Sequence, residues 1–214
     1  MDRSRRSPDR RPLPAGEDEA ASAPRIIGGD LRGRFLEFTP AARTRPMKER
    51  VRESLFNLLG VDVKGRAAID LFAGTGALGF EAVSRGAIRA VLAERHFPTA
   101  DVLRRSARSL GIENRVEVRP GDVLLWAKRM PPLLTTAPWI VFVSPPWSFF
   151  SDRRDELCGL IAAFIAAAPS GSTIVAESDT SFDATALPEA AAWTNREVPP
   201  AVLHFWRRPM TEPA

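Results

Sequence analysis

The 214-residue sequence contains one cysteine, no tyrosine and two histidines. A single thiol, Cys158, builds neither a disulfide framework nor a cysteine-based metal cluster, so we expect no metal and a reducing, cytoplasmic location. The absence of tyrosine excludes the Tyr–Lys catalytic pair found in some oxidoreductases. Apolar runs are short as well. The longest, residues 157–168, falls below the roughly 18 residues of a membrane span, and we expect no membrane partner.

Basic residues cluster between residues 25 and 53, in a chain whose formal net charge is +4. Such a cluster is the pattern expected of a protein that binds a phosphate backbone. A solvated helix face gives the same pattern and is the alternative interpretation. The candidate phosphate-binding residues are Arg32, Arg34, Arg43, Arg45, Arg50 and Arg52.

Residues 67–79, AAIDLFAGTGALG, combine a buried strand, a tight turn and the start of a helix. Gly74 and Gly76 allow the backbone to approach a ligand closely, and Gly79 lets the helix pack against the strand. The three glycines satisfy the spacing G-x-G-x-x-G. That spacing alone does not distinguish a dinucleotide site from other nucleoside sites.

Carboxylates follow three successive predicted strands, at Asp70, Glu94 and Asp122. Because parallel strands end at the same edge of a sheet, we expect these side chains to face one ligand. S-adenosylmethionine suits them, since it has an ammonium group, a ribose diol and an exocyclic amine but no phosphate. The diphosphate of NAD would gain nothing from acids beyond the one that binds ribose. The alternative is that the three are helix caps or solvated strand ends.

The order of strands and helices predicts an α/β fold with a mostly parallel, doubly wound, seven-stranded sheet and an antiparallel edge. We expect a disordered tail over residues 1–24, whose arginines leave a transit-peptide interpretation open. A basic hairpin and a helix opening at Thr44-Arg45-Pro46 make up residues 25–60, and the main domain is 61–214. Predicted strands are 67–72, 89–94, 115–119, 139–143, 172–177, 193–198 and 201–207, and predicted helices are 76–85, 97–110 and 152–168.

A second candidate site element, Ser144-Pro145-Pro146-Trp147, follows the fourth strand. Two prolines remove two backbone donors, which leaves carbonyl oxygens free to accept hydrogen bonds from a substrate. The neighbouring tryptophan can stack on a base, an interaction worth about 1–3 kcal/mol. Acceptors that orient an amine beside a stacking ring are what methylation of an exocyclic amine requires. The alternative is a Pro-Pro loop with a core tryptophan.

Together these residues resemble the RsmD family of 16S rRNA (guanine-N2)-methyltransferases. The likeness runs from about residue 25 to at least 147 and includes RIIGG, TRPMKERVRESLFNLL and DLFAGTGALGFEAVSRGA. It implies a Rossmann-like class I methyltransferase fold, S-adenosylmethionine as donor, and 16S rRNA or an assembling 30S subunit as partner of a monomer. By position, Glu94 would hold the ribose and Asp122 the adenine amine. The other implied cofactor-binding residues are Asp70, Phe72, Gly74, Thr75, Gly76 and Arg95.

This chain departs from the family pattern at Ser144, where Asp or Asn is expected, and at Trp147, where Tyr or Phe is expected. Serine carries neither a charge nor an amide dipole, and its oxygen lies nearer the backbone. Three functions therefore stay open: an active guanine-N2 methyltransferase, a catalytically weak or silent RNA-binding relative, and a nucleotide-dependent oxidoreductase. Asp70 and the lack of tyrosine disfavour the last.

Overall fold

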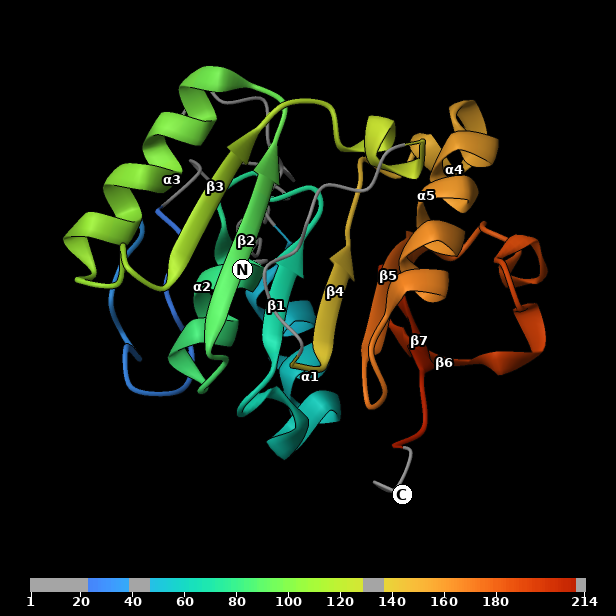
Figure 1. Cartoon of the computed structure of the whole chain (residues 1–214), viewed down its shortest axis with the longest axis horizontal. Coiled ribbons are helices and arrows are strands. Elements are labelled where there is room, and N and C mark those ends of the chain that lie inside the picture. Colours follow the sequence, from blue (N-terminus) through green and yellow to red (C-terminus); the bar gives the residue numbers. More distant parts are fainter. Residues whose placement is uncertain (1–22, 39–46, 129–136, 211–214) are drawn as a thin grey trace, which may run out of the picture.

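The computed structural model describes residues 23–38, 47–128 and 137–210. Its centre is a seven-stranded sheet in the order β3-β2-β1-β4-β5-β7-β6, with the chain ends of β1 to β4 pointing to the same edge (Figure 1). We call this the carboxyl edge. The strands are β1 (Ala67–Asp70), β2 (Arg89–Glu94), β3 (Val116–Pro120), β4 (Trp139–Val143), β5 (Thr173–Asp179), β6 (Trp193–Val198) and β7 (Ala201–Arg207).

The predicted mostly parallel, seven-stranded sheet is confirmed. Strands β1 to β5 pair in parallel, and β7 runs antiparallel to both β5 and β6. The antiparallel strand is therefore one position inside the edge, and β6 is outermost. A connection of only two residues joins β6 to β7, and so short a link requires an antiparallel pair.

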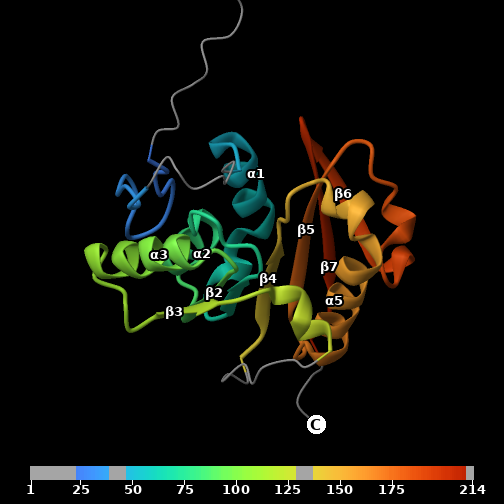
Figure 2. The ribbon, with the colours of Figure 1, turned by 90° about the horizontal axis from the view of Figure 1, so that it is seen from above.

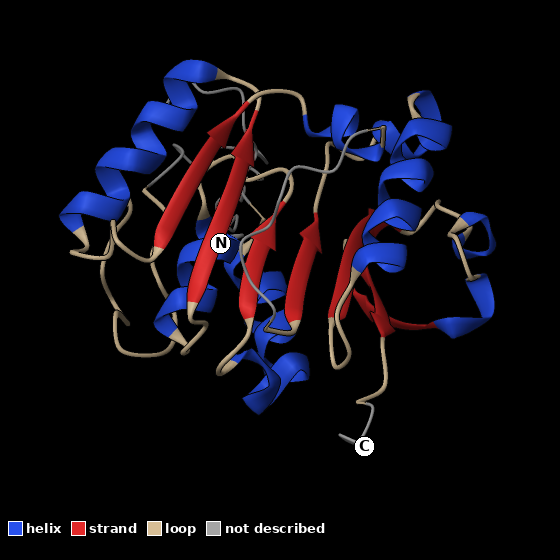
Figure 3. Cartoon of the chain, in the orientation of Figure 1, coloured by secondary structure: helices blue, strands red, loops and turns tan. Residues whose placement is uncertain are grey.

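Apolar side chains cover both faces of the sheet, which explains why the parallel strands are almost continuously apolar. Figure 2 shows α1, α2, α3 and residues 23–38 on one face, and α5 on the other. One buried cluster joins Ala68 of β1 to the first group, and another joins Ile69 to α5. None of the described helices is both long and apolar enough to cross a lipid bilayer. The α-helices are α1 (Glu49–Leu59), α2 (Ala77–Ser84), α3 (Phe97–Ser109), α4 (Phe149–Asp152) and α5 (Arg154–Ala167), drawn blue in Figure 3.

Two predicted helices differ from the observed ones. The helix expected over 152–168 is two helices, α4 and α5, because Arg153 has non-helical dihedrals of φ −132° and ψ 30°. Helix α1 begins at Glu49 in the described residues, and the predicted start at Thr44-Arg45-Pro46 lies outside them. Short 3₁₀ helices, which the sequence did not predict, are η1 (Gly60–Val63), η2 (Val123–Ala127), η3 (Ala184–Ala186) and η4 (Ala190–Ala192).

The predicted basic hairpin is present, but its ladder is a single bridge between Arg25 and Phe35. Helix α2 holds it in place, since the backbone N–H groups of Asp30 and Leu31 donate to the carbonyl and hydroxyl oxygens of Ser84, each at 2.9 Å. Residues of the hairpin and of α1 belong to the same buried cluster as α2 and α3. The division of the chain at residues 24 and 60 stays a prediction.

Two glycines of the hairpin allow a matched test of this docking. Gly29 and Gly33 both have positive φ, but a Cβ on Gly29 would lie 1.9 Å from the carbonyl oxygen of Ser84, whereas one on Gly33 meets nothing within 4 Å. We expect Gly33→Ala to cost about 1–2 kcal/mol from backbone strain alone. Gly29→Ala should cost roughly 1–3 kcal/mol more, because the hairpin must move away from α2. Urea unfolding measures both costs.

Hydrogen exchange at the amides of Asp30 and Leu31 should be faster in Gly29→Ala and unchanged in Gly33→Ala. This result would show that the lost stability comes from the contact between the hairpin and α2. Equal stabilities of the two variants would contradict the described contact.

Candidate active site

The glycine turn lies at the carboxyl edge, between the end of β1 and the start of α2. Gly74 and Gly76 have φ values of 51° and 78°, and Gly76 is the residue before the first helical turn. A Cβ on Gly76 would lie 2.5 Å from the ring of Phe80 and 2.7 Å from Leu103. The turn therefore packs directly on the core, and only glycine fits at position 76.

Asp70 lies beneath this turn and is 1% exposed. Its Oδ2 accepts from the backbone N–H of Gly79 at 3.3 Å, and its Oδ1 is buried with no hydrogen-bond partner among the described residues. Burial raises the pKa of Asp70 to about 7, the nearby charge of Glu94 adds to the rise, and the N–H groups of Gly79 and Phe72 oppose it. A buried, unpaired carboxylate oxygen is costly, and a cationic or hydrogen-bonding ligand would relieve that cost.

Glu94 connects the end of β2 to the glycine turn. Its Oε2 accepts from the N–H of Gly74 at 2.9 Å and its Oε1 from the N–H of His96 at 2.8 Å. Each carboxylate oxygen keeps a second acceptor position, so the side chain is fixed and can still bind a hydroxyl group. The next residue, Arg95, is exposed.

Asp122 lies at the end of the third neighbouring strand. Its Oδ1 accepts from the N–H of Leu124 at 3.0 Å, and its Oδ2 lies 3.8 Å from a guanidinium nitrogen of Arg153. The N–H of Gly121 donates to the carbonyl of Glu94 at 2.9 Å, which ties this loop to the second acid. The three predicted carboxylates thus lie at the ends of adjacent strands, at one edge of the sheet. Their ligand-binding roles stay predictions.

Ser144 follows β4 and contacts a residue that the sequence analysis missed. Register pairs Val143 with Ala176, which places Ser144 beside Glu177 on β5. The hydroxyl of Ser144 donates to Oε2 of Glu177. Glu177 is 7% exposed, and burial raises the pKa of its carboxyl group while the hydrogen bond from Ser144 partly offsets the rise. The sequence pattern that identified Glu94, an acid at the end of an apolar run, also marks Glu177.

The two prolines after Ser144 differ in their carbonyl groups. The Pro146 carbonyl accepts from the N–H of Phe149 at 2.9 Å, so the expectation that both proline carbonyls are free is wrong for this one. It starts the first turn of α4. The Pro145 carbonyl has no donor among the described residues. Trp147 is 37% exposed, which excludes the core-tryptophan alternative.

The side chains of Phe72 and Phe149 connect the two candidate site elements. Their rings meet edge to face, with centroids 6.0 Å apart and an interplanar angle of 88°. Phe72 follows β1 and Phe149 opens α4. The contact therefore holds the segment after β1 against the segment after β4, so the glycine turn and the Ser-Pro-Pro-Trp segment lie side by side.

Arg52 was expected to face a phosphate backbone, and this is wrong. It is 2% exposed, and its guanidinium group donates to the carbonyl of Arg25 at 2.6 Å. Burial lowers the pKa of Arg52, and the negative charges of Glu81 and Glu49 partly offset this decrease. The side chain joins α1 to the hairpin and is inaccessible to RNA. Arg43 and Arg45 lie outside the described residues.

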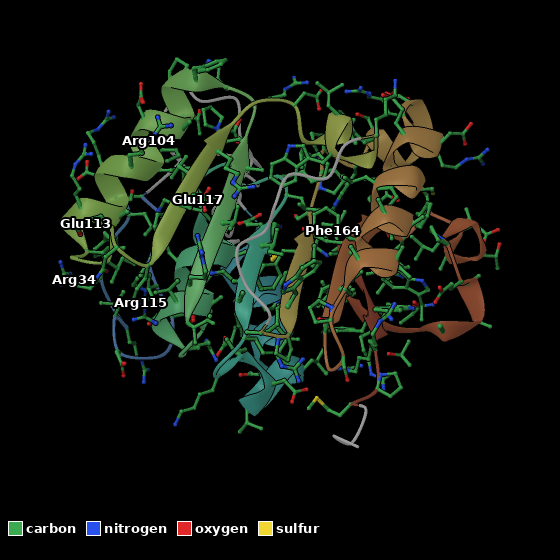
Figure 4. All side chains as sticks on the ribbon, viewed as in Figure 1. Arg34, Arg104, Glu113, Arg115, Glu117 and Phe164 are labelled. Carbon is green, nitrogen blue, oxygen red and sulfur yellow. The ribbon has the colours of Figure 1, made fainter. Side chains whose placement is uncertain are left out.

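The remaining candidate arginines lie at two opposite edges of the sheet. Arg50, at the start of α1, is exposed and donates to the carbonyl of Pro199 in the connection that follows β6, at the carboxyl edge. Arg32 is in the hairpin tip that docks on the end of α2. Arg34 donates to the carbonyl of Ser109 at the end of α3, and Figure 4 places it near Arg115, just before β3. Arg32 and Arg34 are therefore at the opposite edge of the sheet, which we call the amino edge.

Residues 24–205 match a protein-family model described as Conserved hypothetical protein 95. This chain belongs to that family, the RsmD family. The Escherichia coli protein named Ribosomal RNA small subunit methyltransferase D is 38% identical over 123 residues, which are 58% of this chain and 60% of that protein. The chain spans 53% of the length of a Bacillus subtilis relative and 62% of one from Buchnera aphidicola.

Solved structures share the fold of this RsmD-family chain. The structure of Escherichia coli yhhF is 29% identical with a TM-score of 0.70, and the match covers 89% of this chain and 100% of that one. An RNA methyltransferase from Salinibacter ruber, in complex with S-adenosyl-L-homocysteine, is 20% identical with a TM-score of 0.56 over 79% and 97% of the chains. The second likeness shows the fold alone, that of class I methyltransferases.

In this RsmD-family chain the candidate site at the carboxyl edge combines four acidic side chains, an exposed tryptophan and a Ser–Glu pair in which the glutamate is buried. Within the described residues, no group of three or more His, Cys, Asp or Glu side chains is placed to hold a metal ion. The arrangement can bind hydrogen-bond donors and cations, and it can accept hydrogen bonds from an amine. The four acids are Asp70, Glu94, Asp122 and Glu177.

The raised pKa of Asp70 predicts a measurable pH dependence of stability. Below about pH 4 the carboxyl is protonated in both the folded and the unfolded chain. As the pH rises from about 4 to about 7, only the unfolded chain loses this proton, so folding stability falls by an amount on the order of 4 kcal/mol. We expect Asp70→Asn to gain stability relative to the natural chain across this window, measured by urea unfolding at pH 4.5 and 7.5. A constant difference between the two proteins would contradict the shift.

Proposed function

We propose that this chain transfers a methyl group from S-adenosylmethionine to the exocyclic N2 amine of a guanine in 16S rRNA. The observation that carries the proposal is the side-by-side placement of two site elements in a member of the RsmD family. One is the glycine turn with Asp70 and Glu94. The other is the Ser-Pro-Pro-Trp segment that begins at Ser144. The proposed substrate places the reaction in the cytoplasm.

The residues at the glycine turn fit S-adenosylmethionine. The unpaired Oδ1 of Asp70 suits an ammonium group near the turn, and the fixed carboxylate of Glu94 suits a ribose diol. Asp122 is half-exposed and can accept from an exocyclic amine. When bound, the cofactor supplies a methyl group that leaves sulfur as the substrate nitrogen loses a proton. The further residues proposed to line this site are Phe72, Gly74, Thr75, Gly76 and Arg95.

The Ser-Pro-Pro-Trp segment supports a role in holding the guanine. The Ser144 hydroxyl oxygen and the Pro145 carbonyl can accept the two N–H bonds of the amine, which turns the nitrogen lone pair toward the glycine turn. The exposed ring of Trp147 can stack on a base that has left its helix. Pro146 fixes the backbone between them.

A catalytically silent RNA-binding relative is the second candidate, and the serine at position 144 favours it. A neutral hydroxyl is a weaker acceptor than the Asp or Asn that the family resemblance implies. Such a protein would bind the cofactor and rRNA without transferring the methyl group.

Mass spectrometry of rRNA tests the function. Small subunits from a strain that lacks this gene should miss one N2-methylguanosine, and the purified protein with S-adenosylmethionine should restore it. Trp147→Ala should lower the rate about 5- to 150-fold, the equivalent of losing one base-stacking contact of about 1–3 kcal/mol. Trp147→Phe keeps a stacking ring and should retain most of the activity. An unchanged methylation pattern in the deletion strain would contradict the proposal.

Calorimetry separates the three functions. We expect S-adenosylhomocysteine to bind and NAD not to bind. Glu94→Ala should weaken binding about 10- to 150-fold through the loss of charged hydrogen bonds. Asp101→Asn, a change in the exposed ion pair with Arg104, serves as the control and should leave affinity unchanged. Binding of NAD alone would indicate an oxidoreductase, and cofactor binding without methyl transfer would indicate the silent relative.

The separation of the arginines predicts which of them contact RNA. Arg50 is at the carboxyl edge with Trp147, whereas Arg32 is at the amino edge. We expect Arg50→Ala to weaken rRNA binding and to reduce the slope of log affinity against log salt by about 0.7–0.9, the value for one lost phosphate contact. Arg32→Ala should change the slope less. A larger loss in Arg32→Ala would place the RNA on the hairpin face.

A further inference from the structure

Glu177 is a buried carboxylate with little local support. It is 7% exposed, and the described residues give it one hydrogen bond, from the Ser144 hydroxyl. Burying a carboxylate costs several kcal/mol unless cations or several donors compensate. Here burial raises the pKa of the group, and Ser144 is the single opposing influence. The carboxylate is therefore placed against a residue of the proposed site at a cost in stability.

The other two buried glutamates, Glu81 and Glu94, have the hydrogen bonds and ion pairs expected of structural carboxylates. Glu81 forms an ion pair with Arg85 at 2.6 Å and accepts from the N–H of Ile27 at 2.8 Å. Glu94 accepts two backbone N–H groups. Each of these carboxylates joins segments of the fold through charge-assisted bonds. Among the residues that the structure describes, the Glu177 carboxylate bonds only to the side chain of Ser144, so a structural role does not explain its burial.

We propose that Glu177 is a positioning residue for the methyl transfer, acting through Ser144; this inference rests on the proposed function. A hydroxyl group has one proton and two lone pairs. Because the Ser144 proton is directed to Glu177, both lone pairs of Oγ are free to face the substrate amine. The carboxylate also polarises the hydroxyl, which makes Oγ a stronger acceptor. The Ser–Glu pair thus accepts a hydrogen bond from the amine, the task for which the resemblance to the RsmD family implies an Asp or Asn at position 144. No bond to Glu177 forms or breaks.

Strand register supports this assignment independently of the hydrogen bond. The last paired residues of β4 and β5 are Val143 and Ala176, and the next residue on each strand is a member of the pair. Both members therefore stand at the carboxyl edge, at the ends of adjacent strands, beside Pro145, whose carbonyl has no donor in the described part of the chain. An amine at this position would meet two acceptors from the β4 end, with the carboxylate behind one of them.

Steady-state kinetics of the full chain test the proposal. Glu177→Gln keeps the shape and an acceptor oxygen but removes the charge. We expect kcat to fall about tenfold, the difference between a charged and a neutral hydrogen bond. KM for rRNA and the affinity for S-adenosylhomocysteine should stay unchanged. Asp179→Asn makes the same chemical change two residues along β5, where the carboxylate accepts from Ser181, and should keep activity within about twofold.

A double variant at positions 144 and 177 distinguishes a positioning role of Glu177 from a purely structural one. Ser144→Asp alone places two carboxylates in contact, which should lower activity. In the double variant Ser144→Asp with Glu177→Gln, the amide can donate to the new carboxylate, and activity should recover above that of either single variant. Losses that simply add would overturn the proposal, because a merely structural Glu177 gives no such recovery.

A titration by carbon-13 NMR of the glutamate carboxyl groups tests the hydrogen bond without any activity. In Ser144→Ala the pKa of Glu177 should rise further, since the donor that favours its charged form is gone. An equal pKa in both proteins would overturn the proposal even if Glu177→Gln fails to fold. Methyl transfer by the natural chain with full activity in Glu177→Gln would refute the inference alone. A natural chain that binds rRNA but transfers no methyl group would refute the proposed function and this inference with it.

Discussion

The candidate site depends on carboxylates that bind the backbone of the glycine turn. Glu94 accepts from the N–H of Gly74, and Asp70 accepts from the N–H of Gly79 in the first turns of α2. Both bonds place negative charge near the start of a helix, where the helix dipole favours it. They hold a turn whose two glycines have positive φ, and they do so with groups from two different strands. The turn is thus fixed before any ligand arrives, which lowers the entropic cost of binding.

The same arrangement costs stability. Asp70 and Glu177 are buried carboxylates whose pKa values burial raises, and Asp70 has an oxygen with no partner among the described residues. Polar groups held at such a cost are typical of binding and catalytic sites, where the ligand provides the missing interactions. Both of these buried carboxylates lie at the carboxyl edge, at the ends of β1 and β5, which is consistent with a candidate site there.

Much of this fold could be predicted from the sequence because local signals agree. Strands 89–94, 139–143, 193–198 and 201–207 have the predicted bounds, since apolar runs and turn residues mark the same positions. What failed depended on contacts between distant segments. The clustering of basic residues predicted that Arg52 faces a phosphate backbone, but its guanidinium group is buried against the hairpin. The contact between Glu177 and Ser144 depends on the β4–β5 register, which no local sequence pattern contains. The helix is interrupted at Arg153, although the residues on both sides of it are helical, so their composition did not predict the interruption.

The burial of Arg52 also changes how the basic region works. Because its guanidinium group binds the carbonyl of Arg25, one arginine of the cluster joins the hairpin to α1. The exposed arginines are then divided between the two edges of the sheet by the hairpin that Ser84 and α2 hold in place. Arg50 lies at the same edge as the Ser-Pro-Pro-Trp segment. Arg34 lies at the opposite edge, against the end of α3. The charge cluster that looks continuous in the sequence is therefore divided in space between two edges of the sheet.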